Sequence, residues 1–375
     1  MRQCPRIQIL SGRITNFCQI RDLKPQYIRK GIDRVIEIEG KSFLYFSGTS
    51  YLGIGQNVEF LEVLAKNLFD LGANHGQSRV NNIRLKIFDE FEEFFAQEAK
   101  APKSAVLSSG YLAGIAATQY LAESAEEIWV APNTHAAVIP NGYSSGTQLN
   151  FNQWKKACQE QASQLFGKNI LLIGNAVDPL LGEIHDYSWV KDLAEKNSIS
   201  LLIDDSHAFG VLGRGVFGTY TQWQNPAIKL VVSGSLGKAL ALPAGIILGN
   251  EEIIDAIKST PLYGGASPGS PAHLHTFMET QSIYEKSKSQ LQDYCGIFAQ
   301  EISGFKGIKG SRDFPAFIID KVDWVSKLEN AGIIISSFPY PTQSSPHINR
   351  IVISAFHEFD DLFYLVNTLY QLQKE

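Results

Sequence analysis

The chain has 375 residues, of which 44% are hydrophobic and 19% are charged, and its formal net charge is −5. This length allows two or three domains, and the composition is that of an ordinary globular protein. The acidic balance gives no electrostatic reason to expect a nucleic acid or an anionic membrane as a partner.

Targeting and redox signals are also missing from the sequence. Residues 1–16 lack a sustained apolar stretch, so we expect no signal peptide, and no run of about 18 apolar residues predicts a spanning helix. Four cysteines are scattered without a CxxC pair, which favours reduced thiols in a cytoplasmic protein and no metal site. They are Cys4, Cys18, Cys158 and Cys295.

The N-terminal part of the chain is predicted to form two short strands and then two helices. Residues 34–40 and 42–48 are strand-like. Residues 58–72 predict a helix closed by a glycine, and residues 84–99 predict a second, amphipathic helix.

From residue 104 onward, short apolar runs alternate with helical stretches. Near-continuous apolar strands that alternate with helices predict a mostly parallel sheet covered on both faces. The predicted strands are residues 104–110, 126–133, 169–177, 199–207, 229–235 and 244–250, with helices at 113–122 and 189–197 between them.

After residue 251 the pattern becomes that of an α+β unit. Helices are predicted at 251–260, 273–302, 323–332 and from Glu358 on, and strands at 314–320, 333–338 and 349–356. We therefore predict an α/β protein in which residues 51–255 form a large domain and residues 256–375 form a small α+β domain. The N-terminal segment, residues 1–50, is expected to pack with the small domain.

Two acids and a histidine follow the buried strand that ends near residue 204. The C-terminal ends of strands are where open α/β sheets bind ligands. Asp204 could hold a protonated ring nitrogen there, and His207 could hydrogen-bond a phenolic oxygen. The alternative is an aspartate that caps a helix beside a histidine with a structural role.

The G-x-G-x-x-G stretch at residues 213–218 does not predict a dinucleotide site. That fingerprint follows a strand directly and opens a helix, with an acid about 20 residues further on. Here the strand ends several residues earlier, and the position about 20 residues beyond Gly218 is Lys238 rather than an acid.

Lys238 follows the next predicted strand and lies among small residues. It is the only charged residue between Lys229 and Glu251. Such surroundings lower the pKa of an amine and favour Schiff-base chemistry, and the hydroxyls of Ser233 and Ser235 could bind a phosphate. The alternative is a lysine that extends to solvent at a strand end, and the neighbouring Asp-x-x-His element weakens it.

Two further strand ends carry candidate cofactor contacts. Ser109, Gly110 and Tyr111 stand between a strand and a helix whose N-terminal N–H groups can bind a phosphate. His135 follows another strand and could stack on an aromatic ring. An ordinary turn and a structural histidine are the alternatives.

Together these motifs resemble those of the α-oxoamine synthases, a branch of the class I/II aminotransferase superfamily that includes 8-amino-7-oxononanoate synthase. The matches occur in family order over nearly the whole chain, and the Asp/His/Lys set is the most specific part. The pattern D-[ED]-A-H-x-x-G-x-x-G corresponds to residues 204–213, T-F-[GS]-K to 235–238, S-S-G-[FY] to 108–111, N-H-A-S to 134–137, N-x-Y-L-G to 49–53 and R-L-x-L-T-A-A-H to 350–357.

The resemblance implies a PLP-dependent transferase of fold type I, with pyridoxal 5′-phosphate (PLP) bound to Lys238 as a Schiff base. It implies that Asp204 pairs with the ring nitrogen, that His207 bonds the ring 3-oxygen and that His135 stacks on the ring. The residues expected near the phosphate are Ser109, Gly110, Tyr111 and Ser235, and Arg350 is expected to bind the carboxylate of the amino acid.

The reaction implied by the resemblance is the condensation of an amino acid with an acyl-CoA-type thioester. The alternatives are a PLP-dependent aminotransferase that acts on a small amino acid and a PLP-binding protein that has lost catalysis. Arg350, Lys238, Asp204 and His207 favour an active enzyme over the last of these.

The chain departs from the family pattern at four places. A G-S-G-G-S-R loop is replaced at residues 73–79, the histidine of the next helix is replaced by Phe88, and E-[GS]-x-[FY]-S-M-D-G is replaced at residues 175–182. The hydroxyl residues that bind the phosphate of the partner subunit fall at Gly264 and Gly265. We expect a homodimer with each site near the interface, in which backbone N–H groups of the two glycines replace the hydroxyls. The alternative is a phosphate with fewer partners and weaker binding of PLP.

Overall fold

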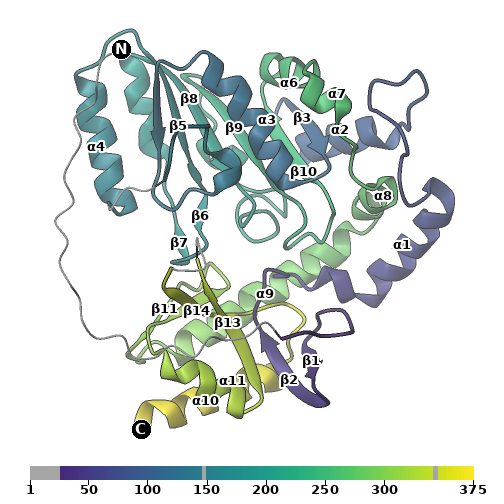
Figure 1. Cartoon of the computed structure of the whole chain (residues 1–375), viewed down its shortest axis with the longest axis vertical. Coiled ribbons are helices and arrows are strands. Elements are labelled where there is room, and N and C mark those ends of the chain that lie inside the picture. The colour runs from purple at the N-terminus through teal and green to yellow at the C-terminus, as the bar shows by residue number, and fades with distance from the viewer. Residues whose placement is uncertain (1–25, 146–148, 341–344) are drawn as a thin grey trace.

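The computed structural model describes residues 26–145, 149–340 and 345–375. Among these residues the strands form two six-stranded sheets and a two-stranded ribbon. Figure 1 shows the central sheet with its flanking helices at one end of the molecule and the second sheet at the other, with the long helix α9 (Gln281–Glu301) extending between them. Cys158 and Cys295 are buried and free, whereas Cys4 and Cys18 lie outside the described residues.

The central sheet has the strand order β3-β10-β9-β8-β5-β4. Its strands are β3 (Lys103–Leu107), β4 (Glu127–Val130), β5 (Asn169–Asn175), β8 (Ser198–Asp204), β9 (Ile228–Ser235) and β10 (Gly245–Gly249). Strands β4, β5, β8 and β9 run parallel, and β10 runs antiparallel to both β9 and β3. The prediction of an α/β fold with a mostly parallel sheet is confirmed, and β5 and β8 are buried along nearly their whole length, as expected of strands covered on both faces.

Helices cover both faces of this sheet and enclose two hydrophobic clusters. The buried side chains of α3 (Gly110–Glu123) and α6 (Glu251–Lys258) belong to one cluster. Those of α2 (Ile87–Ala99), α4 (Phe151–Ser163) and α8 (Pro271–Glu279) belong to the other. The remaining helices of this part are α1 (Val58–Leu71), α5 (Tyr220–Trp223) and α7 (Pro261–Gly265), with short 3-10 helices at Ile54–Gln56, Ala136–Val138 and Ser188–Glu195.

The second sheet combines the two ends of the chain in the order β1-β2-β13-β14-β12-β11. Its strands are β1 (Val35–Ile38), β2 (Lys41–Phe46), β11 (Ile308–Lys309), β12 (Ala316–Ile319), β13 (Ile333–Pro339) and β14 (His347–Val352), and α10 (Asp323–Asn330) and α11 (Phe359–Lys374) accompany it. Strand β2 pairs in parallel with β13, which supports grouping the N-terminal segment with residues 256–375. The domain boundaries themselves stay a prediction.

Several predicted elements differ from those of the structure. Helix α2 begins at Ile87 rather than at Arg84, and the predicted α-helix at 189–197 is replaced by the 3-10 helix Ser188–Glu195. The predicted helix 273–302 is divided at Thr280, whose hydroxyl donates to the carbonyl of Thr276 (2.7 Å), a bond that bends helices. Helix α4 was not predicted, although the capping box of Asn150 and Gln153 marks its start.

No helix in the described part of the chain is long and apolar enough to cross a membrane.

Candidate functional site

Adjacent strands of the central sheet end with polar side chains at the same edge. Asn175 at the end of β5 is paired in register with Asp204 at the end of β8, and Asp204 is paired with Ser233 of β9. Because parallel strands have their carboxyl ends at one edge, residues that are distant in the sequence meet there. This edge is where the structure places the candidate site.

The two acids at the end of β8 lie in different environments. Asp204 accepts a hydrogen bond from the backbone N–H of Ser206 (2.8 Å), and its other oxygen lies 3.9 Å from Nδ1 of His135. Asp205 is fully buried and accepts hydrogen bonds from the backbone N–H and the hydroxyl of Thr219 (2.6 and 2.8 Å). Burial raises the pKa of Asp205 to about 7. Asp204 therefore faces the site, whereas Asp205 anchors the loop that follows β8.

Lys238 lies just after β9, within the electrostatic influence of Asp204 and Arg350. Burial is the main cause that lowers the pKa of its amine to about 8; the carboxylate of Asp204 opposes this change and the guanidinium of Arg350 adds to it. Such an amine is uncharged at neutral pH far more often than an exposed lysine. It is therefore suited to act as a nucleophile.

Of the two predicted histidines, His207 lies near this lysine and His135 lies near Asp204. Burial lowers the pKa of His207 well below its usual value, and the charges of Lys238 and Arg350 lower it further, so the imidazole is neutral. The side chain of His135 is 45% exposed, which leaves ring surface for stacking. The ring of Tyr111 stands edge-on to His135 with the centroids 6.2 Å apart.

Helix α3 begins at the same edge of the sheet, and its first residue, Gly110, lies very close to the backbone of Ser235. Ser109 caps the helix through its side-chain oxygen, which accepts a backbone N–H (3.2 Å). A Cβ on Gly110 would stand 2.4 Å from Cα of Ser235, so only glycine allows the helix N-terminus to lie against the end of β9. The hydroxyl of Ser235 and the N–H groups of a 14-residue helix thus form a cradle that fits a phosphate.

Two buried polar atoms near this edge have no hydrogen-bond partner among the described residues, Oγ of Ser233 and Nε of Arg350. Arg350 lies on β14, is 5% exposed and donates from Nη1 to the carbonyl of Pro179 (2.5 Å). A buried polar atom without a partner costs about 1–3 kcal/mol. Both atoms therefore fit a site that a ligand completes, and Nε of Arg350 remains available for a carboxylate.

Sequence reasoning missed two residues that position the site. The side-chain oxygen of Asn175 accepts from the backbone N–H of His135 (3.1 Å), and its amide donates to the carbonyl of Asn133 (2.8 Å). The hydroxyl of Ser206 accepts from the backbone N–H of Ser235 (2.8 Å). Asn175 ends a strand at the same edge as Asp204, which is the signal that could have found it.

The G-x-G-x-x-G stretch forms a closed turn. Gly213 and Gly218 form an isolated β-bridge, and both have left-handed backbone angles, with φ of 74° and 81°. A Cβ on Gly213 would stand 1.8 Å from the carbonyl oxygen of Gly218. The turn itself therefore requires these glycines, in keeping with the interpretation that they do not bind a dinucleotide.

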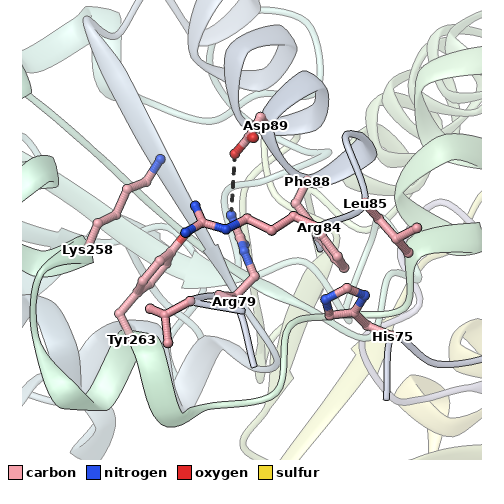
Figure 2. A pocket seen from close by; sticks show the side chains of 9 residues that line it. His75, Arg79, Arg84, Leu85, Phe88, Asp89, Lys258 and Tyr263 are labelled. Atoms are coloured by element: carbon pink, nitrogen blue, oxygen red, sulfur yellow. Dashed lines mark ion pairs between the residues drawn. The ribbon is translucent and has the colours of Figure 1, made fainter. Parts of the chain in front are cut away.

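Two of the four departures from the family pattern, the 73–79 loop and Phe88, line a separate pocket of about 260 Å³, and Tyr263, which precedes Gly264, lines it as well. The guanidinium of Arg79 lies between aromatic rings there, 4.8 Å from the centroid of Phe88 and 5.1 Å from that of Tyr263. The lining does not include Lys238. Figure 2 shows its labelled side chains: His75, Arg79, Arg84, Leu85, Phe88, Asp89, Lys258 and Tyr263.

The predicted role of the Gly264 backbone N–H is wrong for the chain as it folds. Gly264 lies within α7, and its N–H donates to the carbonyl of Thr260 (3.1 Å). Its carbonyl accepts from the hydroxyl of Ser78, and a Cβ on it would stand 3.1 Å from the side chain of Val80. An N–H that is bonded inside a helix is not available to an anion, so the segments around residues 78 and 264 pack on each other instead.

Glu92 is a buried carboxylate that joins the elements around this pocket. It is 4% exposed and accepts from the backbone N–H of Val106 (2.8 Å), the hydroxyl of Tyr263 (2.9 Å) and the side chains of Arg79 (3.2 Å) and Lys258. We expect Glu92→Ala to lower the free energy of unfolding by about 3–5 kcal/mol, because two cations lose their buried partner. Urea denaturation measures this change.

Glu93→Ala is the matched control, since Glu93 is the exposed neighbour on the same helix. It should change the free energy of unfolding by no more than about 0.5 kcal/mol. Equal effects of the two substitutions would show that the Glu92 network does not stabilise the fold.

The geometry defines a class of site: a partly neutral lysine, an acid and a neutral histidine lie beside a phosphate cradle at the edge of an α/β sheet. The sequence matches the profile of the family "Aminotransferase class I and II" over residues 47–369. The chain belongs to this family and is a PLP-dependent transferase with the fold type I architecture.

Individual relatives point to one branch of the family. The chain is 27% identical to 8-amino-7-oxononanoate synthase of Petrotoga mobilis over 361 residues, which cover 90% of each chain. It is 24% identical to serine palmitoyltransferase of Sphingobacterium spiritivorum over 392 residues, 98% of this chain and 97% of that one. The structure resembles a serine palmitoyltransferase from S. paucimobilis solved with bound PLP and myriocin, with a TM-score of 0.76 at 16% identity over 92% of both chains. Both named enzymes are α-oxoamine synthases, so the resemblance drawn from the motifs is confirmed.

Proposed function

We propose that the protein is an acyltransferase that condenses an amino acid with an acyl-CoA-type thioester. The observation that carries this proposal is the meeting of Lys238, Asp204 and Arg350 at one edge of the sheet. The relatives named 8-amino-7-oxononanoate synthase and serine palmitoyltransferase support the condensation.

The residues that would hold PLP are those whose donor atoms fit its parts. The N-terminus of α3 and Ser235 would bind the phosphate, Asp204 would face the ring nitrogen, His207 the 3-oxygen, and His135 one face of the ring. When bound at Lys238, PLP supplies an electron sink for negative charge that develops at the α-carbon of the amino acid.

Side chains of the protein would orient the amino acid and transfer its α-proton. Arg350 orients the amino acid by its carboxylate. The carboxylate of Asp204 would hold a proton on the ring nitrogen of the cofactor, and the free amine of Lys238 would accept the α-proton of the amino acid. The pKa of about 8 suits this last step, because a base with a pKa near the working pH is both available and strong enough.

CoA release, assayed with a panel of amino acids and acyl-CoA thioesters, tests the proposed reaction. We expect release that depends on both substrates. Formation of a 2-oxo acid without CoA release would instead identify an aminotransferase. An absorption spectrum that no amino acid changes would identify a PLP-binding protein without catalysis. A homodimer with the sites near the interface, and a cytoplasmic location, stay predictions.

Arg350→Ala should raise the KM for the amino acid by roughly 10–10²-fold, because a hydrogen-bonded charge pair contributes about 1.5–3 kcal/mol. The KM for the acyl thioester should change little. Arg350→Lys keeps the charge but loses the planar fork, so its effect on the amino acid should be intermediate. Steady-state kinetics with each substrate varied in turn measures the two KM values separately. Equal effects on the KM for the amino acid and for the acyl thioester would rule out the carboxylate role.

A further inference from the structure

Tyr51 contacts the candidate site from outside the central sheet. It lies in the loop after β2, is fully buried, and its hydroxyl lies 2.8 Å from Nδ1 of His207. No other hydrogen bond of this hydroxyl is found in the described parts of the chain. Tyr51 belongs to one of the motifs matched in the sequence, but no role was predicted for it.

The direction of this hydrogen bond follows from the surroundings. Burial raises the pKa of Tyr51 far above its usual value, so the phenol keeps its proton. Burial also keeps His207 neutral, so its ring carries a single proton on one of its two nitrogens. If Nδ1 carried that proton, the buried hydroxyl hydrogen of Tyr51 would have no acceptor, at a cost of about 1–3 kcal/mol.

We propose that Tyr51 is a positioning residue that donates its hydroxyl hydrogen to Nδ1 of His207 and thereby holds the ring proton on Nε2. Nε2 of His207, which faces away from Tyr51, is then a hydrogen-bond donor. This is the state that His207 needs in order to bond a phenolic oxygen of a cofactor. This inference rests on the proposed function in naming the PLP 3-oxygen as that acceptor. The tautomer itself can be tested without any cofactor.

The second sheet and the segment that follows it fix the place of Tyr51. The backbone carbonyl of Tyr51 accepts from the N–H of Ala355, and the carbonyl of Ser50 accepts from the hydroxyl of Ser354 (both bonds in the range 2.7–2.8 Å). The ring packs edge-on against Phe314 with the centroids 5.7 Å apart. Residues that follow β14, the strand of Arg350, therefore hold the tyrosine that orients a histidine of the central sheet.

Nitrogen-15 NMR of histidine-labelled protein without PLP measures the tautomer of His207, whose signals are assigned by their loss in His207→Asn. In the wild type we expect a proton on Nε2 and a hydrogen-bonded acceptor at Nδ1. In Tyr51→Phe we expect Nδ1 to lose the shift of a bonded acceptor, and the form protonated on Nδ1 to become detectable. A wild-type ring protonated on Nδ1, or ring signals that Tyr51→Phe leaves unchanged, would overturn the proposal.

Tyr187→Phe is the matched control. Tyr187 is also buried, and its hydroxyl donates to the carbonyl of Asn175 (2.9 Å), which keeps a contact with Nδ1 of His185 (3.0 Å) when the hydroxyl is removed. This variant loses a hydroxyl of the same kind and should leave the His207 signals in place. If both variants shift those signals equally, the effect is general loosening and the proposal fails.

A second measurement separates this inference from the proposed function. In PLP-loaded protein, the pH midpoint of the absorption change of the lysine-bound cofactor should rise in Tyr51→Phe, because the 3-oxygen anion loses a fixed donor. It should not move in Tyr187→Phe. If PLP does not bind at all, the proposed function fails while the NMR result still decides the role of Tyr51.

Discussion

Lys238→Ala is expected to abolish the absorption band of the lysine-bound cofactor and to remove CoA release. The amine is both the attachment point for PLP and the proposed base, so no other group can replace it at this edge of the sheet. The wild-type band should disappear on borohydride reduction, and mass spectrometry should then locate the cofactor on Lys238. A band that borohydride leaves unchanged in the wild type would refute the assignment.

Lys229→Ala is the matched control for this substitution, because Lys229 is an exposed lysine of β9, the strand that Lys238 follows. It should leave both the band and the activity unchanged. The pH dependence adds a further check. Since burial lowers the pKa of Lys238 from 10.5 to about 8, the rate at which PLP loads onto the cofactor-free protein should rise through pH 8 and level off above it. An exposed lysine would instead gain reactivity up to a pH of about 10.4.

Asp204→Asn should keep PLP bound but slow exchange of the substrate α-proton by roughly 10²–10³-fold. A neutral amide does not hold a proton on the ring nitrogen, so negative charge at the α-carbon is less well stabilised. Exchange of the α-proton in deuterated water, followed by NMR, measures this step without the acyl donor. Exchange at the wild-type rate would show that Asp204 does not face the ring.

Asp205→Asn provides the comparison within the same motif. Asp205 accepts two hydrogen bonds from Thr219 and has its pKa raised to about 7 by burial. Its substitution should lower thermal stability, because an amide does not replace both acceptor positions, and should change α-proton exchange much less than Asp204→Asn does. The reverse order of effects would exchange the roles of the two acids.

Local patterns in the sequence are enough to predict the central sheet and the position of its ligand edge. Continuous apolar runs in β5, β8 and β9 indicate strands covered on both faces, and ligands bind at the carboxyl ends of such strands. Asp204 ends β8, and His207 and Lys238 come within three residues after β8 and β9. Their places at the carboxyl ends of these strands are enough to select them as candidate site residues.

Two predictions from the sequence were wrong because local patterns do not show which hydrogen bonds form. Thr280 divides a continuous helical pattern because its hydroxyl donates to the carbonyl of Thr276. The spacing of apolar residues does not indicate such a side-chain bond. The Gly264 N–H was predicted to be available to an anion, but the short helix α7 uses it. In both cases one hydrogen bond that involves a backbone group decides the outcome.

Motifs of this chain indicate its family, its cofactor and the residue types at its site, because these depend on short spacings along single strands and turns. Contacts between elements that are far apart in the chain are decided only by the tertiary structure. Arg350 reaches Pro179, and Tyr51 reaches His207, through the packing of the second sheet against the central one. Which acid faces the site, and which nitrogen of His207 meets a donor, depend on burial and partners that arise only when both sheets are assembled.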